Sequence, residues 1–125
     1  MRVSLVMGIG VLAACAARPP PSASSSTSPG ASCSRLSPAA CVGAPPTHAL
    51  DVRPILERRC FACHANDGPA AESHDFSRLE TVRAQRSAIA DEVASCSMPP
   101  PRAPPLTESE AATLLRWVAC GAPAH

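Results

Sequence analysis

The segment from Glu57 to Ala65, written ERRCFACHA, limits what this chain can fold into more than any other part of its sequence. It places two thiols and an imidazole, at Cys60, Cys63 and His64, directly after a helical-looking run and before a polar loop. Such a cluster is typical of a disulfide pair, of part of a metal site, or of the attachment site of a covalent haem. The three possibilities predict different cores, and the remaining sequence discriminates among them.

The chain is so small that it needs an additional stabilising element, such as a disulfide, a metal ion or a cofactor. Its 125 residues hold at most one small domain with appended segments, and a domain smaller than about 100 residues buries only a marginal core. Large side chains are scarce as well, because the sequence contains two Phe, one Trp and no Tyr. We therefore expect that something other than protein fills part of the interior.

The first residues resemble a bacterial lipoprotein signal. Val3–Leu12 is an apolar run too short to span a bilayer as a helix, and Leu12–Cys15, written LAAC, resembles a lipobox. The alternatives are an ordinary signal peptide and a short buried segment. We expect residues 1–14 to be removed and the sulfur of Cys15 to carry a lipid that anchors the chain to a periplasm-facing membrane. The outer membrane is slightly favoured, because Ala16 and not Asp follows the cysteine.

A change in composition separates a linker from a folded part. Residues 15–47, which include Cys33 and Cys41, are rich in Pro, Ser and Ala and cannot bury enough apolar area to offset their ordering entropy. They are predicted to form a flexible, partly polyproline tether, and residues 48–125 are predicted to form the folded domain. The charges of the chain exclude nucleic acid as a partner, because the formal net charge is only +1 and no basic run is present.

The folded part has the pattern of an all-α domain. One helix of about ten residues is predicted from an N-cap at Asp51 to near Cys60. A second is predicted over Leu79–Ala94, and a third from a capping box at Thr107 to Gly121. The prolines between the last two forbid both helix and central strand, and no alternating strand pattern occurs.

The spacing of the two thiols and the imidazole matches C-x-x-C-H, the attachment pattern of c-type haem. Thiols at Cys60 and Cys63, three residues apart on one turn, can each add to a vinyl group of the same porphyrin, and His64 then faces the iron. Met98 supports this interpretation, because it is the only methionine after the signal and lies 34 residues beyond His64, among prolines. A His/Met ligand pair raises the reduction potential and favours electron transfer. His74 is the alternative axial ligand.

The segment Leu50–Pro123 resembles a small monohaem c-type cytochrome domain of exported bacterial proteins. The shared motifs occur in order and are Ile55-Leu56 before Cys60, then Met98-Pro99-Pro100, then Leu106-Thr107 with Glu110, Leu114 and Trp117, then Gly121-Ala122-Pro123. The resemblance implies a cytochrome c-like helical fold around one covalent haem c, with thioether bonds at Cys60 and Cys63. It also implies axial ligation by His64 and Met98. The chain departs from the family in its short His-to-Met interval and its four additional cysteines.

This assignment leaves an even number of cysteines to pair. Of the seven in the chain, one is assigned to lipid and two to haem, and the other four are expected to form disulfides in an oxidising compartment. We expect Cys96 to pair with Cys120 and Cys33 with Cys41. The first of these bonds would hold the Met98 loop against the last helix.

These residues predict a membrane-tethered electron carrier and not an enzyme, with a redox protein of unknown identity as its partner. One alternative is a thiol-disulfide oxidoreductase that uses Cys60 and Cys63, although the strand-rich pattern of thioredoxin-like folds is missing. A second alternative is a lipoprotein without catalytic activity, which is stapled by disulfides or by zinc. The zinc ligands would be Cys60, Cys63, His64 and His74.

Overall fold

A computed structural model describes residues 39–125 of the chain. The predicted signal, the lipidation site at Cys15, Cys33 and most of the predicted tether therefore lie outside the described residues. Within the described part, no helix is both long and apolar enough to cross a membrane.

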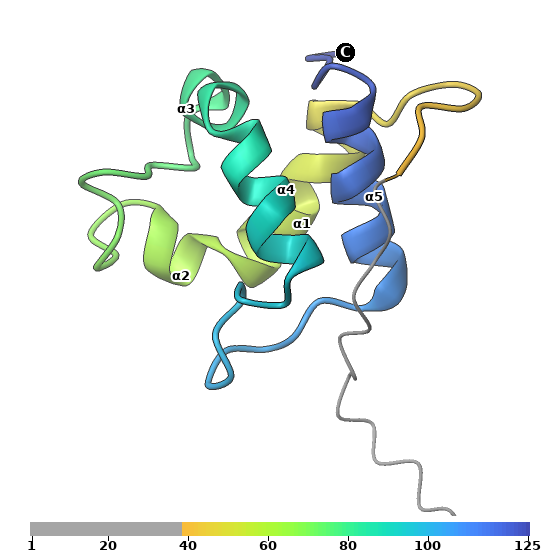
Figure 1. The fold of residues 1–125 in the computed structure, drawn as a ribbon. Coiled ribbons are helices and arrows are strands. Elements are labelled where there is room, and N and C mark those ends of the chain that lie inside the picture. Colours follow the sequence, from red (N-terminus) through yellow and green to blue (C-terminus); the bar gives the residue numbers. More distant parts are fainter. Residues whose placement is uncertain (1–38) are drawn as a thin grey trace, which may run out of the picture.

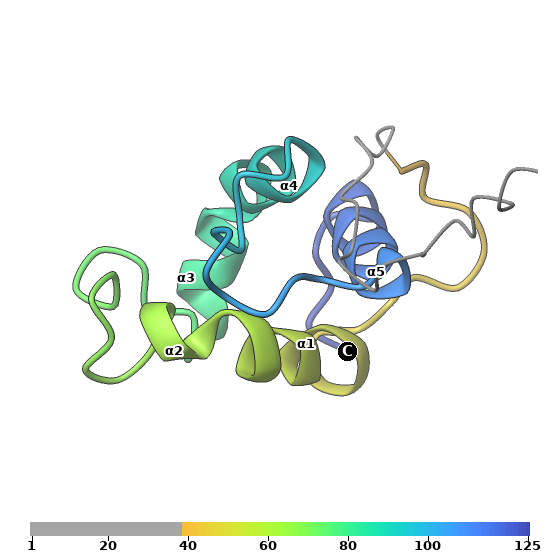
Figure 2. The ribbon, with the colours of Figure 1, turned by 90° about the horizontal axis from the view of Figure 1, so that it is seen from below.

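Every regular element in the described residues is helical, which confirms the all-α fold class. The elements are η1 (His48–Val52), α1 (Arg53–Arg59), α2 (Phe61–His64), α3 (Leu79–Ala84), α4 (Arg86–Ala94) and α5 (Glu108–Ala119). Helix α5 packs against both α4 and η1, and η1 runs directly into α1. Figures 1 and 2 show α4 beside α5, while the chain around α2 extends to one side.

Side-chain caps begin two of the helices, η1 and α5. At α5 the predicted capping box is present, because the amide of Glu110 donates to Thr107 Oγ1 and the amide of Thr107 donates to Glu110 Oε2. At the first helix Thr47 is the N-cap and not Asp51, because the Thr47 side chain accepts from Leu50 while Asp51 accepts from the Thr47 amide. Two residues able to cap lie within one turn there, and the first of them begins the helix.

The helix predicted over Leu79–Ala94 is interrupted. It divides at Gln85, whose φ of −99° and ψ of 9° end α3 and precede α4. The amide of Gln85 still donates to the carbonyl of Thr81, and the amide of Ile89 donates to the carbonyl of Gln85. The break therefore changes the direction of the chain without leaving these main-chain groups unpaired.

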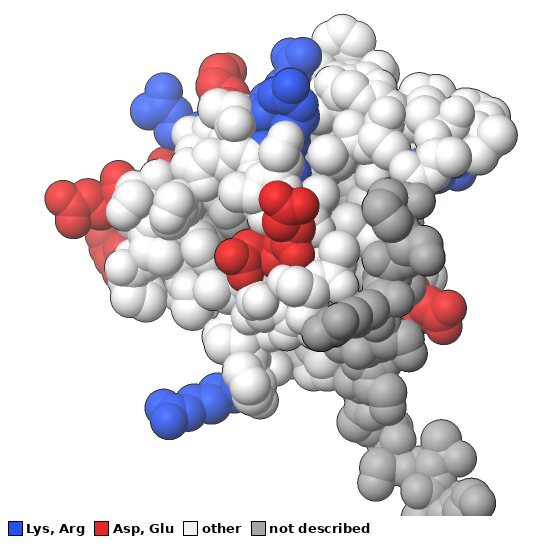
Figure 3. All heavy atoms as spheres, in the orientation of Figure 1, with Lys and Arg blue, Asp and Glu red and all other residues white. Residues whose placement is uncertain are grey.

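Apolar side chains from η1, α1, α3, α4 and α5 form one core. The largest fully buried residues are Trp117, Leu56, Leu114, Val52 and Val82. The indole Nε1 of Trp117 donates to the carbonyl of Pro123, which closes the chain end over the core. Figure 3 shows that charged side chains form small separate groups on one face, and most of that face is uncharged. Stability therefore depends on the core more than on surface ion pairs.

A disulfide joins the beginning of the described chain to the end of α5, and it corrects the predicted pairing. Cys41 is bonded to Cys120, with a Cα–Cα distance of 4.8 Å, whereas the sequence predicted Cys96 with Cys120 and Cys33 with Cys41. Helices α4 and α5 run antiparallel in Figure 1, so the end of α4, which Cys96 follows, lies near the beginning of α5. Cys120 lies at the other end of α5, about 18 Å along a helix of 12 residues. Cys96 is also disulfide-bonded.

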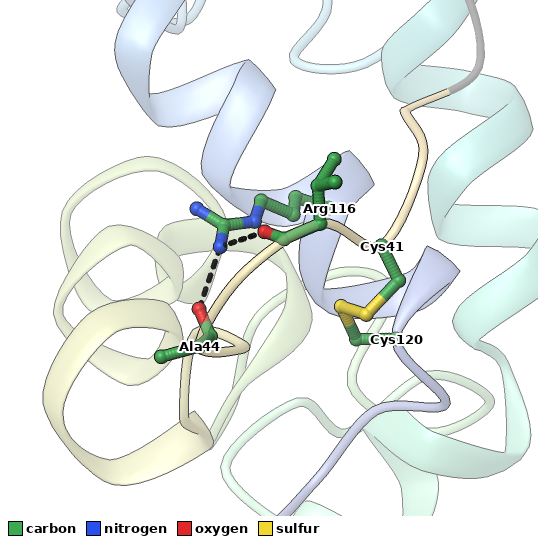
Figure 4. Close-up of a disulfide and its surroundings, with 5 residues drawn as sticks. Cys41, Ala44, Arg116 and Cys120 are labelled. Atoms are coloured by element: carbon green, nitrogen blue, oxygen red, sulfur yellow. Dashed lines mark hydrogen bonds between the residues drawn. A yellow bond between two sulfur atoms is a disulfide. The ribbon is translucent and has the colours of Figure 1, made fainter.

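An arginine reinforces the same junction. Arg116, one turn before Cys120, donates from Nη2 to the carbonyls of Val42 and Ala44 (Figure 4). The segment after Cys41 is therefore fixed to α5 by one covalent bond and two hydrogen bonds to a charged donor, and hydrogen bonds of this kind are stronger than neutral ones.

A buried histidine makes the fold sensitive to acid. His48 is only 8% exposed, its ring centroid lies 6.1 Å from that of Trp117, and its Nε2 has no hydrogen-bond partner. Burial lowers the pKa of His48, and the nearby Arg53 lowers it further. Because the pKa is lower in the folded state, the unfolded state binds the proton more readily. The stabilisation is complete above the unfolded pKa of about 6.5 and is lost as the pH falls through the folded pKa.

We therefore expect the free energy of unfolding to decrease between pH 7.5 and pH 5, and a His48→Phe variant to lose part of that decrease. Phenylalanine keeps the ring in the core but cannot bind a proton. Urea unfolding of both proteins at the two pH values measures the difference. Equal pH dependence in the two proteins would show that His48 is not the group responsible.

Candidate functional site

The C-x-x-C-H segment forms a tight helical turn at the end of α1. The amide of Cys60 donates to the carbonyl of Leu56 at 2.8 Å, and the amide of His64 donates to the carbonyl of Cys60 at 2.9 Å. Cys60 ends α1 and α2 follows immediately as a single turn. Both Cys60 and Cys63 are free thiols and both are partly buried. The fold thus presents two thiols and an imidazole from one short turn.

The loop after α2 folds back onto this turn. The amide of Ala70 donates to the carbonyl of Cys63 at 2.9 Å, and the amide of Phe76 donates to the carbonyl of His64 at 2.6 Å. The Phe76 ring stacks on the His64 ring, with centroids 4.5 Å apart and an interplanar angle of 6°. The imidazole is therefore held by main-chain and aromatic contacts together.

One pocket brings together the site residues that the sequence predicts. It has a volume of about 510 Å³, and Cys60, Cys63, His64 and Met98 all line it. Much of the remaining wall is apolar and includes Leu56, Ala88, Ile89, Val93, Leu106 and Leu114. Met98 comes from the loop between α4 and α5 and is 41% exposed. The alternative ligand, His74, also lines the pocket, so both candidate ligands share one pocket with His64.

The environment keeps Cys60 and His64 uncharged. Burial raises the pKa of Cys60 to about 11, with further contributions from Cys63 and Glu110. Burial also lowers the pKa of His64, as does the neighbouring His74, while the main chain of His74 acts in the opposite direction. The Nδ1 of His64 is buried and has no hydrogen-bond partner. The turn therefore offers a protonated thiol and a neutral imidazole, and neutral imidazole is the form that binds metals.

A carboxylate ties α5 to the residues just before Cys60. Glu110 accepts from Arg59 Nε at 3.0 and 3.2 Å and from Arg58 Nη2 at 3.3 Å. Burial raises the pKa of Glu110, but the Thr107 amide, Arg59 and Arg58 outweigh it, so the pKa is lowered overall. Both arginines also line the pocket. This ion-pair network fixes the end of α1, and hence the position of Cys60, relative to α5.

Three residues that shape the site carry little signal in the sequence. Phe76 and Gln85 have no motif around them, and their roles follow only from the folded loop. Gly68 has a weak signal, because it is the only glycine between α2 and α3. An added Cβ at Gly68 would lie 2.5 Å from the carbonyl oxygen of Cys63. A lone glycine in a polar loop is typical of such a close backbone approach.

No protein-family model, curated protein or solved structure matches the chain. Among residues 39–125, no group of three or more His, Cys, Asp or Glu side chains is arranged to hold a metal ion. The four-ligand zinc site on Cys60, Cys63, His64 and His74 is therefore not assembled in this part of the structure. The function has to be inferred from the pocket itself.

Proposed function

We propose that this chain is an electron carrier that holds one covalently attached haem c in the pocket, with His64 and Met98 as axial ligands. The observation that carries the proposal is the pocket itself, which gathers both thiols, His64 and the distant Met98 against a largely apolar wall. The haem would supply an iron that exchanges one electron, and His64 and Met98 would be the residues that bind this iron.

The residues present fit such a group. The pocket volume of about 510 Å³ lies within the range of ligand pockets, roughly 300–1,000 Å³. Cys60 and Cys63 are unpaired although other cysteines form disulfides, so their sulfurs are free to form thioethers. Phe76 holds the imidazole of His64 by stacking. The largely apolar wall would limit the access of water to the haem, and solvent access tunes the potential of a metal centre.

The same observations weigh against the dithiol alternative. A reactive cysteine needs a lowered pKa, since the thiolate is the nucleophile, whereas burial raises the pKa of Cys60 to about 11. The proposal also includes a tether to a periplasm-facing membrane, with the outer membrane slightly favoured, through a lipid on Cys15. A redox protein would be the partner.

The test is to produce the full chain together with haem-maturation machinery and to record its pyridine haemochrome. We expect one haem per chain, with the spectrum of two thioether bonds. A Cys60→Ser/Cys63→Ser double variant is the control, and it should lack covalently bound haem. A colourless parent protein with two titratable thiols would refute the proposal, and one zinc ion per chain in that protein would favour the stapled lipoprotein.

A further inference from the structure

We infer that Gln85 is a positioning residue for His64, and that through the His74 loop it helps to set the reduction potential of the bound iron. This inference rests on the proposed function. It starts from the break between α3 and α4, which the helix pattern of the sequence does not predict. At that break the side chain of Gln85 is partly buried and lines the same pocket as His64.

The side-chain amide of Gln85 holds the loop that contains Ser73 and His74 by two hydrogen bonds. Its Nε2 donates to the carbonyl of Ser73 at 3.1 Å, and its Oε1 lies 2.6 Å from Nδ1 of His74. Because the main-chain carbonyl of Ser73 can only accept, the NH2 group of the Gln85 side chain must face it. The side-chain oxygen Oε1 therefore faces His74, and Nδ1 of His74 is the donor in that hydrogen bond. The main chain of Gln85 is itself fixed by hydrogen bonds to Thr81 and from Ile89. The junction between α3 and α4 therefore holds the loop that contains Ser73 and His74 in place.

The clamped loop leads directly to the imidazole ligand. The amide of His74 donates to the carbonyl of Ala70, and the amide of Ala70 donates to the carbonyl of Cys63, both at 2.9 Å. The ring centroids of His74 and His64 are 6.0 Å apart. His64 is thus enclosed by Phe76 and by a loop whose position depends on Gln85.

The consequence concerns Nδ1 of His64. This atom is buried and makes no hydrogen bond of normal geometry, although the main chain of His74 is close enough to act on the pKa of the ring. The surroundings of that nitrogen control how strongly the imidazole donates to a metal. If the loop is released, water reaches Nδ1 and the imidazole becomes a stronger donor, which favours the oxidised iron. Water entry also raises the local dielectric constant, which favours the more highly charged state. Both effects lower the reduction potential.

The test is a redox titration of the haem-loaded full chain with Gln85→Met, which keeps the side-chain length but removes both hydrogen bonds. We expect the equilibrium constant for reduction to fall about tenfold, a shift of ~59 mV to more negative potential for one electron. Gln85→Asn keeps an amide on a stem too short to span both partners, and it should shift the potential in the same direction. Ser87→Ala, an exposed position on α4, is the control and should leave the potential unchanged.

A double variant tests the route through the loop. His74→Ala removes one of the two contacts, so its effect and that of Gln85→Met should be less than additive when combined. Additive shifts would overturn the proposed route, and unchanged potentials in Gln85→Met and Gln85→Asn would overturn the inference as a whole. The haemochrome of the same samples separates this result from the proposed function. If the parent protein contains no covalent haem, the proposed function fails and the inference fails with it.

Discussion

Replacing Gly68 by alanine is expected to disrupt the Cys60–His64 turn more than the same change at either other glycine of the described chain. The new Cβ would lie 2.5 Å from the carbonyl oxygen of Cys63 and 2.6 Å from its carbonyl carbon. It would also lie 3.0 Å from the carbonyl oxygen of Ala65. All three are main-chain atoms, so no side-chain rotation relieves the overlap and the Cys63 peptide has to move.

That movement should weaken both stability and haem loading. Overpacking costs about 1–3 kcal/mol and occasionally more, and here the displaced peptide carries one thiol and precedes His64. Urea unfolding measures the first effect, and covalent haem per chain measures the second. Both should decrease in Gly68→Ala.

Gly121→Ala is the matched control. Gly121 has a φ of +86° and no atom lies within 4 Å of an added Cβ, so only backbone strain of roughly 1–2 kcal/mol is expected. It lies after α5 and does not line the pocket, so haem loading should remain. Equal losses of loading in the two variants would contradict the role given to Gly68.

Replacing Met98 by alanine is expected to change the iron environment while leaving the fold largely intact. Met98 is 41% exposed, so its truncation removes little buried area and should cost less than the 2–5 kcal/mol (approximate range) of a core Met→Ala change. As the proposed axial ligand, however, Met98 would raise the potential through its thioether. Its loss should therefore lower the potential by more than the ~59 mV of a tenfold change.

The measurement is a near-infrared and redox study of the haem-loaded variant. The weak sulfur-to-iron band should disappear in Met98→Ala, while the pyridine haemochrome stays unchanged because both thioethers remain. Leu50→Ala, an apolar position that is 80% exposed, serves as the control and should keep the band. If the parent protein itself lacks the band, the sulfur of Met98 is not the sixth ligand and His74 becomes the candidate.

Local signals predict the helices of this chain well, and tertiary contacts explain where they fail. The capping box of Thr107 and Glu110 marks the beginning of α5 because both partners lie within one turn. The break at Gln85 has no such signal, since its side chain makes its contacts with Ser73 and His74, 12 and 11 residues away. Helix periodicity cannot detect a partner in another loop.

The disulfide pairing likewise depends on tertiary contacts that the sequence pattern does not show. Their number indicates disulfides, but the choice of partner depends on the direction in which α5 crosses the core. With α4 and α5 antiparallel, the end of α5 lies beside the segment that begins at Cys41, and Arg116 binds the carbonyls of that segment. Cys60, Cys63, His64 and Met98, the residues that the sequence pattern singles out, line one pocket. The roles of Gly68 and Phe76 depend on the folded path of the loop.

The bond between Cys41 and Cys120 also determines how the domain responds to mechanical force. Tension applied between Ala39 and His125 would pass from one sulfur to the other and leave the intervening chain, with its pocket, unloaded. Only the residues after Cys120 and those before Cys41 would be stretched. Under tension between Ala39 and His125, the pocket would therefore keep its shape until the sulfur–sulfur bond is broken.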